Sequence, residues 1–584
     1  MYNKINFINS IVLMIFLGLS NGYCSVDGSV KFCSINPINN KQILEDTKWD
    51  NLECKDSISV DVSIGEIEPA SIILRADEII DNIRIKIEAP QNENGTKLPS
   101  DMIDTRIVKV WYQNEGAWKT HVKLSEKRVL TPELLLKNDN LVLLGKNTRN
   151  LIKLNSDNKT YFPDDLISGN RIVKNSAFGV QDSNKILPFK LEKNKNKQLW
   201  FTLRAPEGSQ PGLYKAKIEL LSNKIVVASM VMKVNILPFK LDSSKIKYTL
   251  YYRGQLSLFD SDLEGYISSD FKSETQLKHE FLNMKEHGIS NITVYQLLHN
   301  KKFSALDDFA QKQLKKYLSI LKSVGMEGKD LYYLGRLIGI PNNKYLTILL
   351  NDIDVLLSIK NEYGFDNLYL YGVDEAKNKI LSSQNEIWNI VKNKGVKIIA
   401  AGGDNHTNLT KGLTDILVYQ GKRPHREIVL AHEKGNKVYR YANPQVGVEN
   451  PYVYRKNYGY DLWKDGFDGV MNYAYQHAMG FAWNDSDHKI YRDHLFTYPT
   501  IDGVIDTIAW EGFREAVDDI KYLTTLENIL FNRPNDKVAE EAREYLFILK
   551  NNPIKDSPEI IRKKIASYIT TLVLCNSNCK KLGN

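Results

Sequence analysis

Two adjacent carboxylates, Asp374 and Glu375, stand where an apolar stretch of the chain ends. The residues from Asp366 onward are rich in leucine and tyrosine, as β-strands are, and Gly372 comes just before the pair. Carboxyl groups can donate protons to a reacting substrate and accept them from it, which is the task of a general acid–base pair. The pattern therefore predicts proton-transfer chemistry at the tip of a strand.

The pair also has a purely structural interpretation. Neighbouring side chains on a regular strand point to opposite faces, so Asp374 and Glu375 could both reach a ligand only beyond the strand's end. Carboxylates at this place could instead begin a helix, because they accept hydrogen bonds from its first N–H groups. The dipeptide is not specific by itself, since Asp77-Glu78 also follows an apolar run and is assigned no function.

The elements around the pair alternate between strand and helix. The apolar spacing predicts strands at 248–252, 291–296, 330–334, 396–401, 415–419, 437–442 and 469–475, and one more in the stretch 366–376 that carries the two carboxylates. It predicts helices at 274–287, 306–324, 343–363, 384–394 and 426–434. About eight strands over roughly 260 residues match a TIM-type (β/α)8 barrel. A doubly wound open sheet is the competing architecture, but no Gly-x-Gly-x-x-Gly follows the first strand.

The regions on either side of this alternation have other patterns, so we expect a multidomain protein. Short strands with a period of two, separated by Gly/Pro turns, predict a β-sandwich over 23–240. The catalytic barrel is then expected over 241–510 and a C-terminal helical extension over 511–584. Apolar residues at three- and four-residue spacing predict helices there, packed on the outside of the barrel.

Barrel enzymes place reactive groups at the C-terminal ends of their strands. Several of the expected strand ends carry suitable groups, and a tryptophan follows the last strand. The candidate substrate-binding residues are Arg253, Tyr295, Arg336, Tyr441, Asn443, Tyr473, Tyr475 and Trp483. Aromatic rings, arginines and carboxylates around one opening favour a carbohydrate site over a phosphate site, although each residue could instead be an ordinary residue of the rim.

Other chemistries have little support. No P-loop, Gly-x-Ser-x-Gly or His-Glu-x-x-His motif occurs, and the ten histidines show no ligand spacing. We therefore expect neither a metal nor another cofactor, and we expect His488 and His494 on the surface. Arg514, Asp518 and Asp519 are expected to form structural ion pairs on the helix that follows the barrel.

The bulk composition limits the partners. The 584 residues are 42% hydrophobic and 25% charged, as in a folded globular protein. The net charge of +8 comes from scattered lysines without a concentrated basic stripe, which argues against a nucleic-acid partner. Thirty-one tyrosines suit stacking and hydrogen bonding with polar, ring-shaped ligands, or they are strand residues in a strand-rich protein.

The N-terminus has the pattern of a secretory signal peptide over 1–22. Lys4 precedes an apolar run from Ile11 to Leu19 that is too short to span a bilayer, and no later stretch predicts a transmembrane segment. We expect a secreted or periplasmic protein, with a lipid anchor at Cys24 as the alternative. Export permits disulfides, and the expected pairs are Cys33 with Cys54 and Cys575 with Cys579.

Three stretches resemble glycoside hydrolase family 123, the β-N-acetylgalactosaminidase-type enzymes. The segment from Tyr369 to Ala376 is similar to the catalytic strand of the family, and the segment from Tyr498 to Leu523 is a long and specific match. The third stretch that resembles the family consists of residues 132–136 and 211–214 in the expected sandwich. The chain departs from the family at 472–475, where Asn-Tyr-Ala-Tyr stands in place of a tryptophan-rich end.

The resemblance implies hydrolysis of a terminal β-linked N-acetylgalactosamine on a glycan or glycolipid. It implies that Glu375 is the general acid and later the general base. Asp374 would orient the 2-acetamido group, whose carbonyl oxygen attacks the anomeric carbon, so that the substrate supplies the nucleophile.

Two alternatives stay open. The protein could be a glycosidase for a sugar without an acetamido group, with Asp404 or Asp485 as the protein nucleophile. It could also be a non-catalytic, glycan-binding surface protein.

Overall fold

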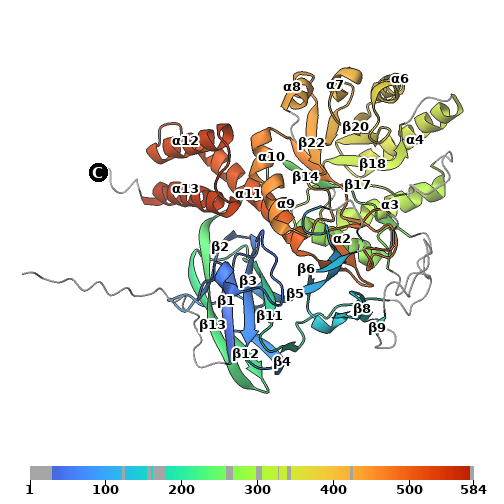
Figure 1. The fold of residues 1–584 in the computed structure, drawn as a ribbon. Helices are drawn as coiled ribbons and strands as arrows, with labels where there is room; N and C mark the ends of the chain where they lie inside the picture. Colours follow the sequence, from blue (N-terminus) through green and yellow to red (C-terminus); the bar gives the residue numbers. More distant parts are fainter. Residues whose placement is uncertain are drawn as a thin grey trace, which may run out of the picture.

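The computed structural model describes residues 29–120, 125, 127–153, 160–161, 179–257, 267–296, 306–326, 328–338, 343–420, 425–488 and 490–578. These residues form an N-terminal β-sandwich, a closed barrel of eight parallel strands and a set of C-terminal helices (Figure 1). The predicted fold class is therefore confirmed. The predicted signal peptide and Cys24 lie outside the described residues.

Two five-stranded sheets face each other in the sandwich. The first has the order β1 (Val30–Ile35), β3 (Ile67–Ala76), β11 (Asn196–Arg204), β5 (Ile103–Asn114) and β6 (Arg128–Leu136). The second has the order β10 (Phe189–Leu191), β4 (Ile80–Ile87), β12 (Gly212–Ser222), β13 (Ile225–Lys240) and β2 (Ile58–Ile64). A small sheet of β7 (Val142–Leu144), β8 (Asn150–Lys153) and β9 (Thr160–Tyr161) follows β6. The predicted disulfide between Cys33 and Cys54 is present, whereas the side chains of Cys575 and Cys579 are outside the described part.

The barrel closes through eight parallel strands in chain order. They are β14 (Lys247–Leu250), β17 (Asn291–Val294), β18 (Asp330–Leu337), β19 (Asn367–Tyr371), β20 (Lys397–Gly402), β21 (Ile416–Gln420), β22 (Lys437–Tyr441) and β23 (Gly469–Asn472), with β23 paired to β14. The closed ring excludes the open doubly wound sheet. The predicted helices are α2 (Glu274–Glu286), α3 (Asp308–Ser323), α4 (Asn343–Glu362), α6 (Asn385–Asn393) and α8 (His425–Glu433).

Alternation along the strands fills two separate cores. On β19, Leu368 and Leu370 face the surrounding helices, while Tyr369 and Tyr371 belong to the cluster that fills the lumen. That lumen cluster is rich in tyrosine and contains Tyr251, Tyr295, Tyr332, Tyr369, Tyr371, Tyr439 and Tyr441. Most of the strand tyrosines in this part of the chain thus serve the inside of the barrel.

Several shorter elements complete the barrel and its rim. The helices are α5 (Asn378–Ser382), α7 (His406–Leu409), α9 (Pro451–Tyr458) and α10 (Tyr460–Asp465). The paired short strands are β15 (Gln255–Leu256) with β16 (Phe271–Lys272), β24 (Gln476–His477) with β25 (His494–Leu495), and β26 (Thr497–Pro499) with β27 (Val504–Asp506). Single 3-10 turns lie at Trp49–Asn51, Ser100–Met102 and Asp139–Leu141.

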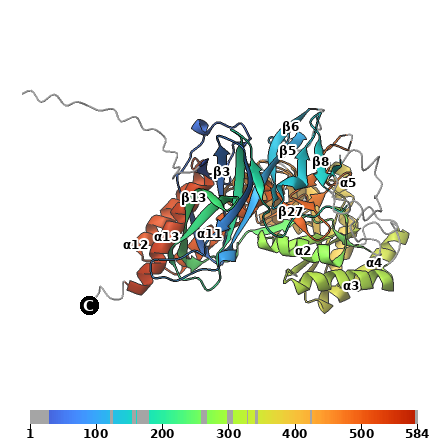
Figure 2. The same ribbon diagram turned by 90° about the horizontal axis from the view of Figure 1, so that it is seen from below.

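The C-terminal helices join the two large parts. Helix α11 (Ile508–Phe531) contacts both α9 of the barrel and β6 of the sandwich. Helix α12 (Lys537–Asn551) contacts α10, whereas α13 (Pro558–Asn578) packs on β13, as Figure 2 shows. The expectation that all these helices cover the outside of the barrel is therefore wrong for α13. None of the helices in the described part of the chain combines the length and the apolar character needed to cross a membrane.

Buried ion pairs hold α13 in this place. Arg562 on α13 donates to Asp519 on α11 at 2.6 Å and also binds Glu68 on β3. Asp519 in addition accepts two hydrogen bonds from Arg455 on α9, each at 3.0 Å. Asp518 pairs with Lys521 at 2.8 Å and Arg514 with Glu511 at 2.7 Å. The structural ion pairs predicted for this helix are confirmed, and they connect sandwich, barrel and C-terminal helices.

Candidate active site

The two carboxylates lie at the C-terminal end of β19, three and four residues after its last residue, Tyr371. Both residues keep a large part of their surface exposed to solvent, although their carboxyl groups are partly buried against the barrel wall. The next helix, α5, has Lys377 at its N-cap and no capping side-chain hydrogen bond, so neither Asp374 nor Glu375 caps it. The structural interpretation of the pair as a helix cap is thus excluded.

A close approach of the backbone sets the path of the chain from β19 to the pair. A Cβ atom on Gly372 would lie 2.7 Å from the ring of Trp388, so only glycine fits there without displacing a buried side chain. The next N–H, of Val373, donates to the side chain of Gln384 at 2.8 Å. Glu375 itself has a φ of +46°, which is in the left-handed region. Residues other than glycine adopt this conformation rarely, and when they do, they are often found at functional sites.

Each carboxylate is held by a different tyrosine. The phenol of Tyr371 donates to Oδ1 of Asp374 at 2.8 Å, and the phenol of Tyr441 donates to Oε1 of Glu375. Tyr371 is the last residue of β19 and Tyr441 the last of β22, so the two donors come from different parts of the barrel wall. One oxygen of each carboxyl group is occupied in this way.

The surroundings raise the pKa values of both phenols and of the Asp374 carboxyl group. Burial raises the pKa of Asp374 and the negative charge of Glu375 adds to it, while the hydrogen bond from Tyr371 lowers it. Burial also raises the pKa values of Tyr371 and Tyr441, so both phenols keep their protons and remain donors. The site therefore combines two protonated phenol donors with a carboxyl group, that of Asp374, whose pKa lies above its usual value.

A second polar group lies at the same end of the barrel. Arg253, just after β14, donates to both oxygens of Asp270 at 3.0 and 3.2 Å and stands over the ring of Tyr295, 5.6 Å from its centre. Tyr473, just after β23, shares a hydrogen bond of 2.8 Å with Nδ1 of His477. The arginine and its partner carboxylate form a fixed pair of hydrogen-bonding groups that a sugar hydroxyl could use.

The structure places some of the predicted binding residues at this opening. Arg253, Tyr295, Tyr441 and Tyr473 lie around it as described, and Asn443 follows β22 with its N–H donating to Tyr458 at 2.9 Å. The side chain of Arg336 is outside the described part. Contact of these residues with a sugar stays a prediction.

Two predicted binding residues are not at the opening. Tyr475 is fully buried, and its phenol donates at 2.9 Å to Asn283 on α2, on the outer side of the barrel. Trp483 is 1% exposed, donates to the carbonyl of Pro499 and packs edge-on against Trp111 of the sandwich, so neither ring face is open to a ligand. Their expected roles are therefore wrong in this structure, because the chain leaves the strand direction after Asn472 and folds back towards the sandwich.

The other carboxylates considered as nucleophiles are held elsewhere. Asp404, after β20, accepts a hydrogen bond of 2.5 Å from Tyr419, whose ring belongs to the shell between strands and helices. Asp485 is buried and paired with Arg492 at 2.5 Å. Likewise, His494 is buried rather than on the surface, with Nδ1 2.7 Å from the carbonyl of Val446.

The sequence did not single out four residues of the site: Tyr251, Asp270, Tyr371 and His477. Tyr371 could have been found, because it precedes Asp374 by three residues on the lumen side of a strand. Asp270 lies in a connection and His477 beyond the last barrel strand, where periodicity gives no signal.

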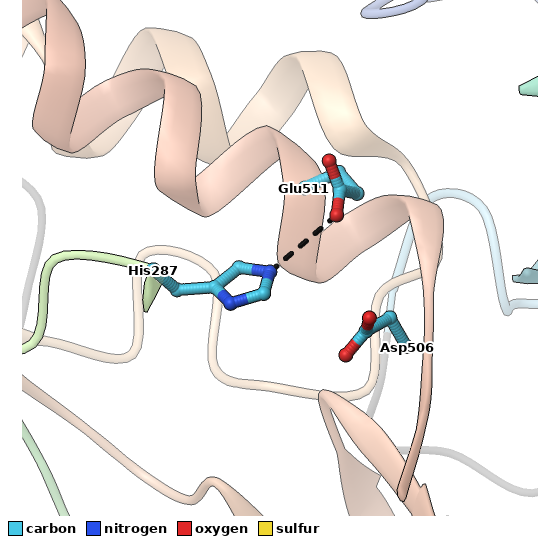
Figure 3. Close-up of side chains that lie close together, drawn as sticks. All are labelled: His287, Asp506 and Glu511. Carbon is cyan, nitrogen blue, oxygen red and sulfur yellow. Dashed lines mark ion pairs between the residues drawn. The ribbon is translucent and has the colours of Figure 1, made fainter. Parts of the chain in front are cut away.

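One group of described residues has the spacing of metal ligands: His287, Asp506 and Glu511 (Figure 3). It lies where α2, β27 and α11 meet, and His287 faces Glu511 at 3.5 Å. Each carboxylate already has a guanidinium partner, Arg106 for Asp506 at 2.6 Å and Arg514 for Glu511 at 2.7 Å. A dication would face two positive charges there, so these side chains fit a buried ion-pair junction better than a metal centre.

Comparison with known proteins agrees with this geometry. Residues 284–526 match the family model "Glycoside hydrolase 123, catalytic domain". No curated protein matches the chain. A solved structure that concerns glycolipid glycan hydrolysis by a family 123 glycoside hydrolase from Clostridium perfringens is similar over 94% of this chain and 98% of that one, at 11% identity and a TM-score of 0.61.

A Bacteroides ovatus GH5 xyloglucanase aligns over 80% of this chain and 99% of that one, but with 7% identity and a TM-score of only 0.28. The Clostridium structure thus shares the fold of nearly the whole chain, sandwich included. The matched residues 284–526 contain β19, Asp374 and Glu375. Most of the barrel, from residue 284 on, together with the first part of α11, thus matches a glycoside hydrolase 123 catalytic domain, and the protein is a glycoside hydrolase.

Proposed function

We propose that the protein is an exo-acting glycosidase that removes a terminal β-linked 2-acetamido sugar, N-acetylgalactosamine first of all, with retention of configuration. In the first step the acetamido carbonyl oxygen attacks the anomeric carbon while Glu375 protonates the departing glycosidic oxygen. Asp374 accepts a hydrogen bond from the acetamido N–H. In the second step Glu375 takes a proton from a water molecule, and the water oxygen attacks the anomeric carbon and opens the oxazolinium intermediate.

The observation that carries this proposal is the arrangement of the two carboxyl groups. They are adjacent in the chain and each has one oxygen bound by a separate tyrosine. Conventional retaining enzymes need two carboxyl groups about 5–5.5 Å apart that flank the scissile bond, whereas substrate-assisted enzymes do not. Neighbouring carboxyl groups on one strand tip suit a mechanism in which one serves the leaving group and the other serves the acetamido group.

The same arrangement supports different roles for the two residues. With Tyr441 on Oε1, the other oxygen of Glu375 is left to carry the proton that the leaving group receives. With Tyr371 on Oδ1, the other oxygen of Asp374 is left to accept the acetamido N–H. Uncharged hydrogen-bond donors at both carboxyl groups also fit an uncharged sugar better than a phosphate.

The substrate class and the location are part of the proposal. The similar Clostridium perfringens enzyme is described by its action on glycolipid glycans, which supports a glycolipid or another glycan as the source of the sugar. The disulfide between Cys33 and Cys54 supports a secreted or periplasmic protein, because such bonds persist in oxidising compartments.

The test is a comparison of aryl β-glycosides in pairs that carry either an acetamido or a hydroxyl group at the second carbon. We expect release from the acetamido sugars, fastest from β-N-acetylgalactosaminide, and inhibition by a thiazoline that resembles the intermediate. Equal rates on both members of a pair, without thiazoline inhibition, would show a protein nucleophile. Binding to a glycan array without release of sugar would show a binding protein.

A further inference from the structure

Two buried tyrosines form a chain of hydrogen bonds that ends on Asp374. The phenol oxygens of Tyr251 and Tyr371 are 2.9 Å apart, and Tyr371 is 2.8 Å from Oδ1 of Asp374. Both tyrosines are only 4% exposed. They are too buried to stack on a sugar, and the proposed reaction gives no role to Tyr251.

The number of available O–H hydrogens decides which group donates in each of these two hydrogen bonds. A phenol has one O–H hydrogen, and an ionised carboxylate can only accept. When Asp374 is ionised, the hydrogen of Tyr371 goes to Asp374, and therefore Tyr251 must donate to the oxygen of Tyr371. Both dipoles then point towards the carboxylate, and such aligned bonds strengthen one another.

Backbone hydrogen bonds of the barrel fix Tyr251, the first residue of this row of hydrogen bonds. Tyr251 donates its N–H to the carbonyl of Asn472 at 3.1 Å and accepts at its own carbonyl from the N–H of Tyr475 at 3.0 Å. Its ring packs edge-on against Tyr371, with centres 6.1 Å apart, and lies tilted against the ring of Tyr473, with centres 5.5 Å apart. The donor is thus held in place before a substrate arrives, which is how polar groups act most effectively in an active site.

Asp374 depends on this support because its other surroundings raise the pKa of its carboxyl group. Burial and the charge of Glu375 raise its pKa, and the bond from Tyr371 opposes them. The titratable groups that influence or are influenced by Asp374 are Glu375 and the phenols of Tyr251, Tyr295, Tyr371, Tyr441 and Tyr473. No cation is among them in the part of the chain that the structure describes.

We infer that Tyr251 and Tyr371 are positioning residues: together they keep Asp374 ionised and occupy its Oδ1, so that Oδ2 alone is presented to the acetamido N–H. This inference rests on the proposed function. It assigns the selection of the acetamido group to three residues, the first of which, Tyr251, directly follows the first barrel strand.

The test compares Tyr371→Phe and Tyr251→Phe with the wild-type enzyme. Each variant removes one oxygen atom and keeps the ring. Without the donor, Asp374 takes up a proton at a higher pH, so the acidic limb of kcat/KM should move upward by about one pH unit in Tyr371→Phe. It should move in the same direction, but less, in Tyr251→Phe. The affinity for the thiazoline at low pH should fall in the same order.

Tyr332→Phe is the matched control, since Tyr332 is a buried tyrosine of the same lumen cluster that does not contact the pair. It should leave the acidic limb in place. If Tyr371→Phe does not fold, Tyr251→Phe decides, because it leaves the bond between Tyr371 and Asp374 intact.

An unchanged acidic limb in a folded variant, or an equal movement in Tyr332→Phe, would overturn the inference. The proposed function would still stand as long as wild-type enzyme prefers acetamido sugars. A wild-type enzyme without that preference would instead refute the proposed function.

Discussion

The phenol of Tyr441, the last residue of β22, donates a hydrogen bond to the carboxyl group of Glu375, which follows β19. The two residues are 66 positions apart in the chain, and strands β20 and β21 lie between β19 and β22 in the barrel wall. The bond leaves one oxygen of Glu375 for the proton and limits the rotation of an otherwise exposed side chain.

Tyr441→Phe should therefore impair proton donation without removing the acid. We expect a fall in kcat of about tenfold, as for the loss of one hydrogen bond to a charged group. The loss should be larger for aryl glycosides with poor leaving groups, which need the proton most. Steady-state kinetics over a series of phenols measures this. Tyr439→Phe, on the same strand and without a contact to Glu375, should behave as wild type; an equal loss there would point to a general disturbance of the lumen.

Glu375→Gln should nearly abolish turnover of a substrate with a poor leaving group. General acid catalysis contributes about 10²–10⁴-fold, and the amide cannot supply a proton. The substituted side chain is exposed and of equal size, so the melting temperature should remain that of the wild type. Kinetics and calorimetry on the same sample separate the two effects. Full activity in the variant would rule out Glu375 as the acid.

Asp374 should set the acidic limb of the pH profile. Its pKa is raised by burial, so it is ionised, and able to accept the acetamido N–H, only above a pH higher than usual for an aspartate. We expect kcat/KM for acetamido substrates to fall as the pH is lowered through this pKa. Asp374→Asn should remove that limb and slow the reaction by about 10²–10³-fold. A variant with the wild-type rate and profile would contradict the role of Asp374.

Gly372→Ala should damage both stability and activity. The new Cβ would lie 2.7 Å from the ring of Trp388 and 3.2 Å from Gln384, which are fully buried and cannot move aside. Overpacking of this kind lowers the free energy of unfolding by about 1–3 kcal/mol, and the displaced backbone carries the catalytic pair. Urea denaturation and kcat should both show the effect. Gly208→Ala, where the added Cβ meets nothing within 4 Å, is the control, and a similar loss there would refute the steric argument.

Arg562→Met should weaken the junction of sandwich, barrel and helices. Arg562 is buried and donates to Asp519, Glu515 and Glu68, and each of these buried carboxylates would lose a positively charged partner. Loss of one partner in such a network costs about 3–5 kcal/mol. Lys563→Met is the matched control, since the exposed pair of Lys563 with Glu559 is worth less than about 1 kcal/mol. Equal unfolding midpoints for the two variants would show that the buried network adds nothing.

Much of the fold could be predicted because its pattern is local. The expected strands and helices of the barrel match the observed ones to within a few residues, from β14 at Lys247–Leu250 to α8 at His425–Glu433. The catalytic pair could be located for the same reason, as it directly follows one strongly apolar strand.

The rest of the site depends on contacts between distant segments. The bond from Tyr441 to Glu375 exists only because the sheet closes into a ring. The expected roles of Tyr475 and Trp483 fail because the chain turns away after Asn472, and a period of two no longer tells which side a residue faces. Helix α13 lies on the sandwich because Arg562 meets Glu68, which lies 494 positions earlier. Periodicity within a segment cannot reveal such pairings.

The cluster of Trp111, Trp483 and Tyr498 has a consequence for how the enzyme can be divided. The segment that returns from the last barrel strand rests on β5 and β6 of the sandwich, and Gln113 of β5 donates to Tyr498 at 3.1 Å. A barrel excised at the linker after β13 would lose the support of one side of its opening. The sandwich is thus not an interchangeable module, and grafting another domain in its place would reshape the entrance through which the sugar must pass.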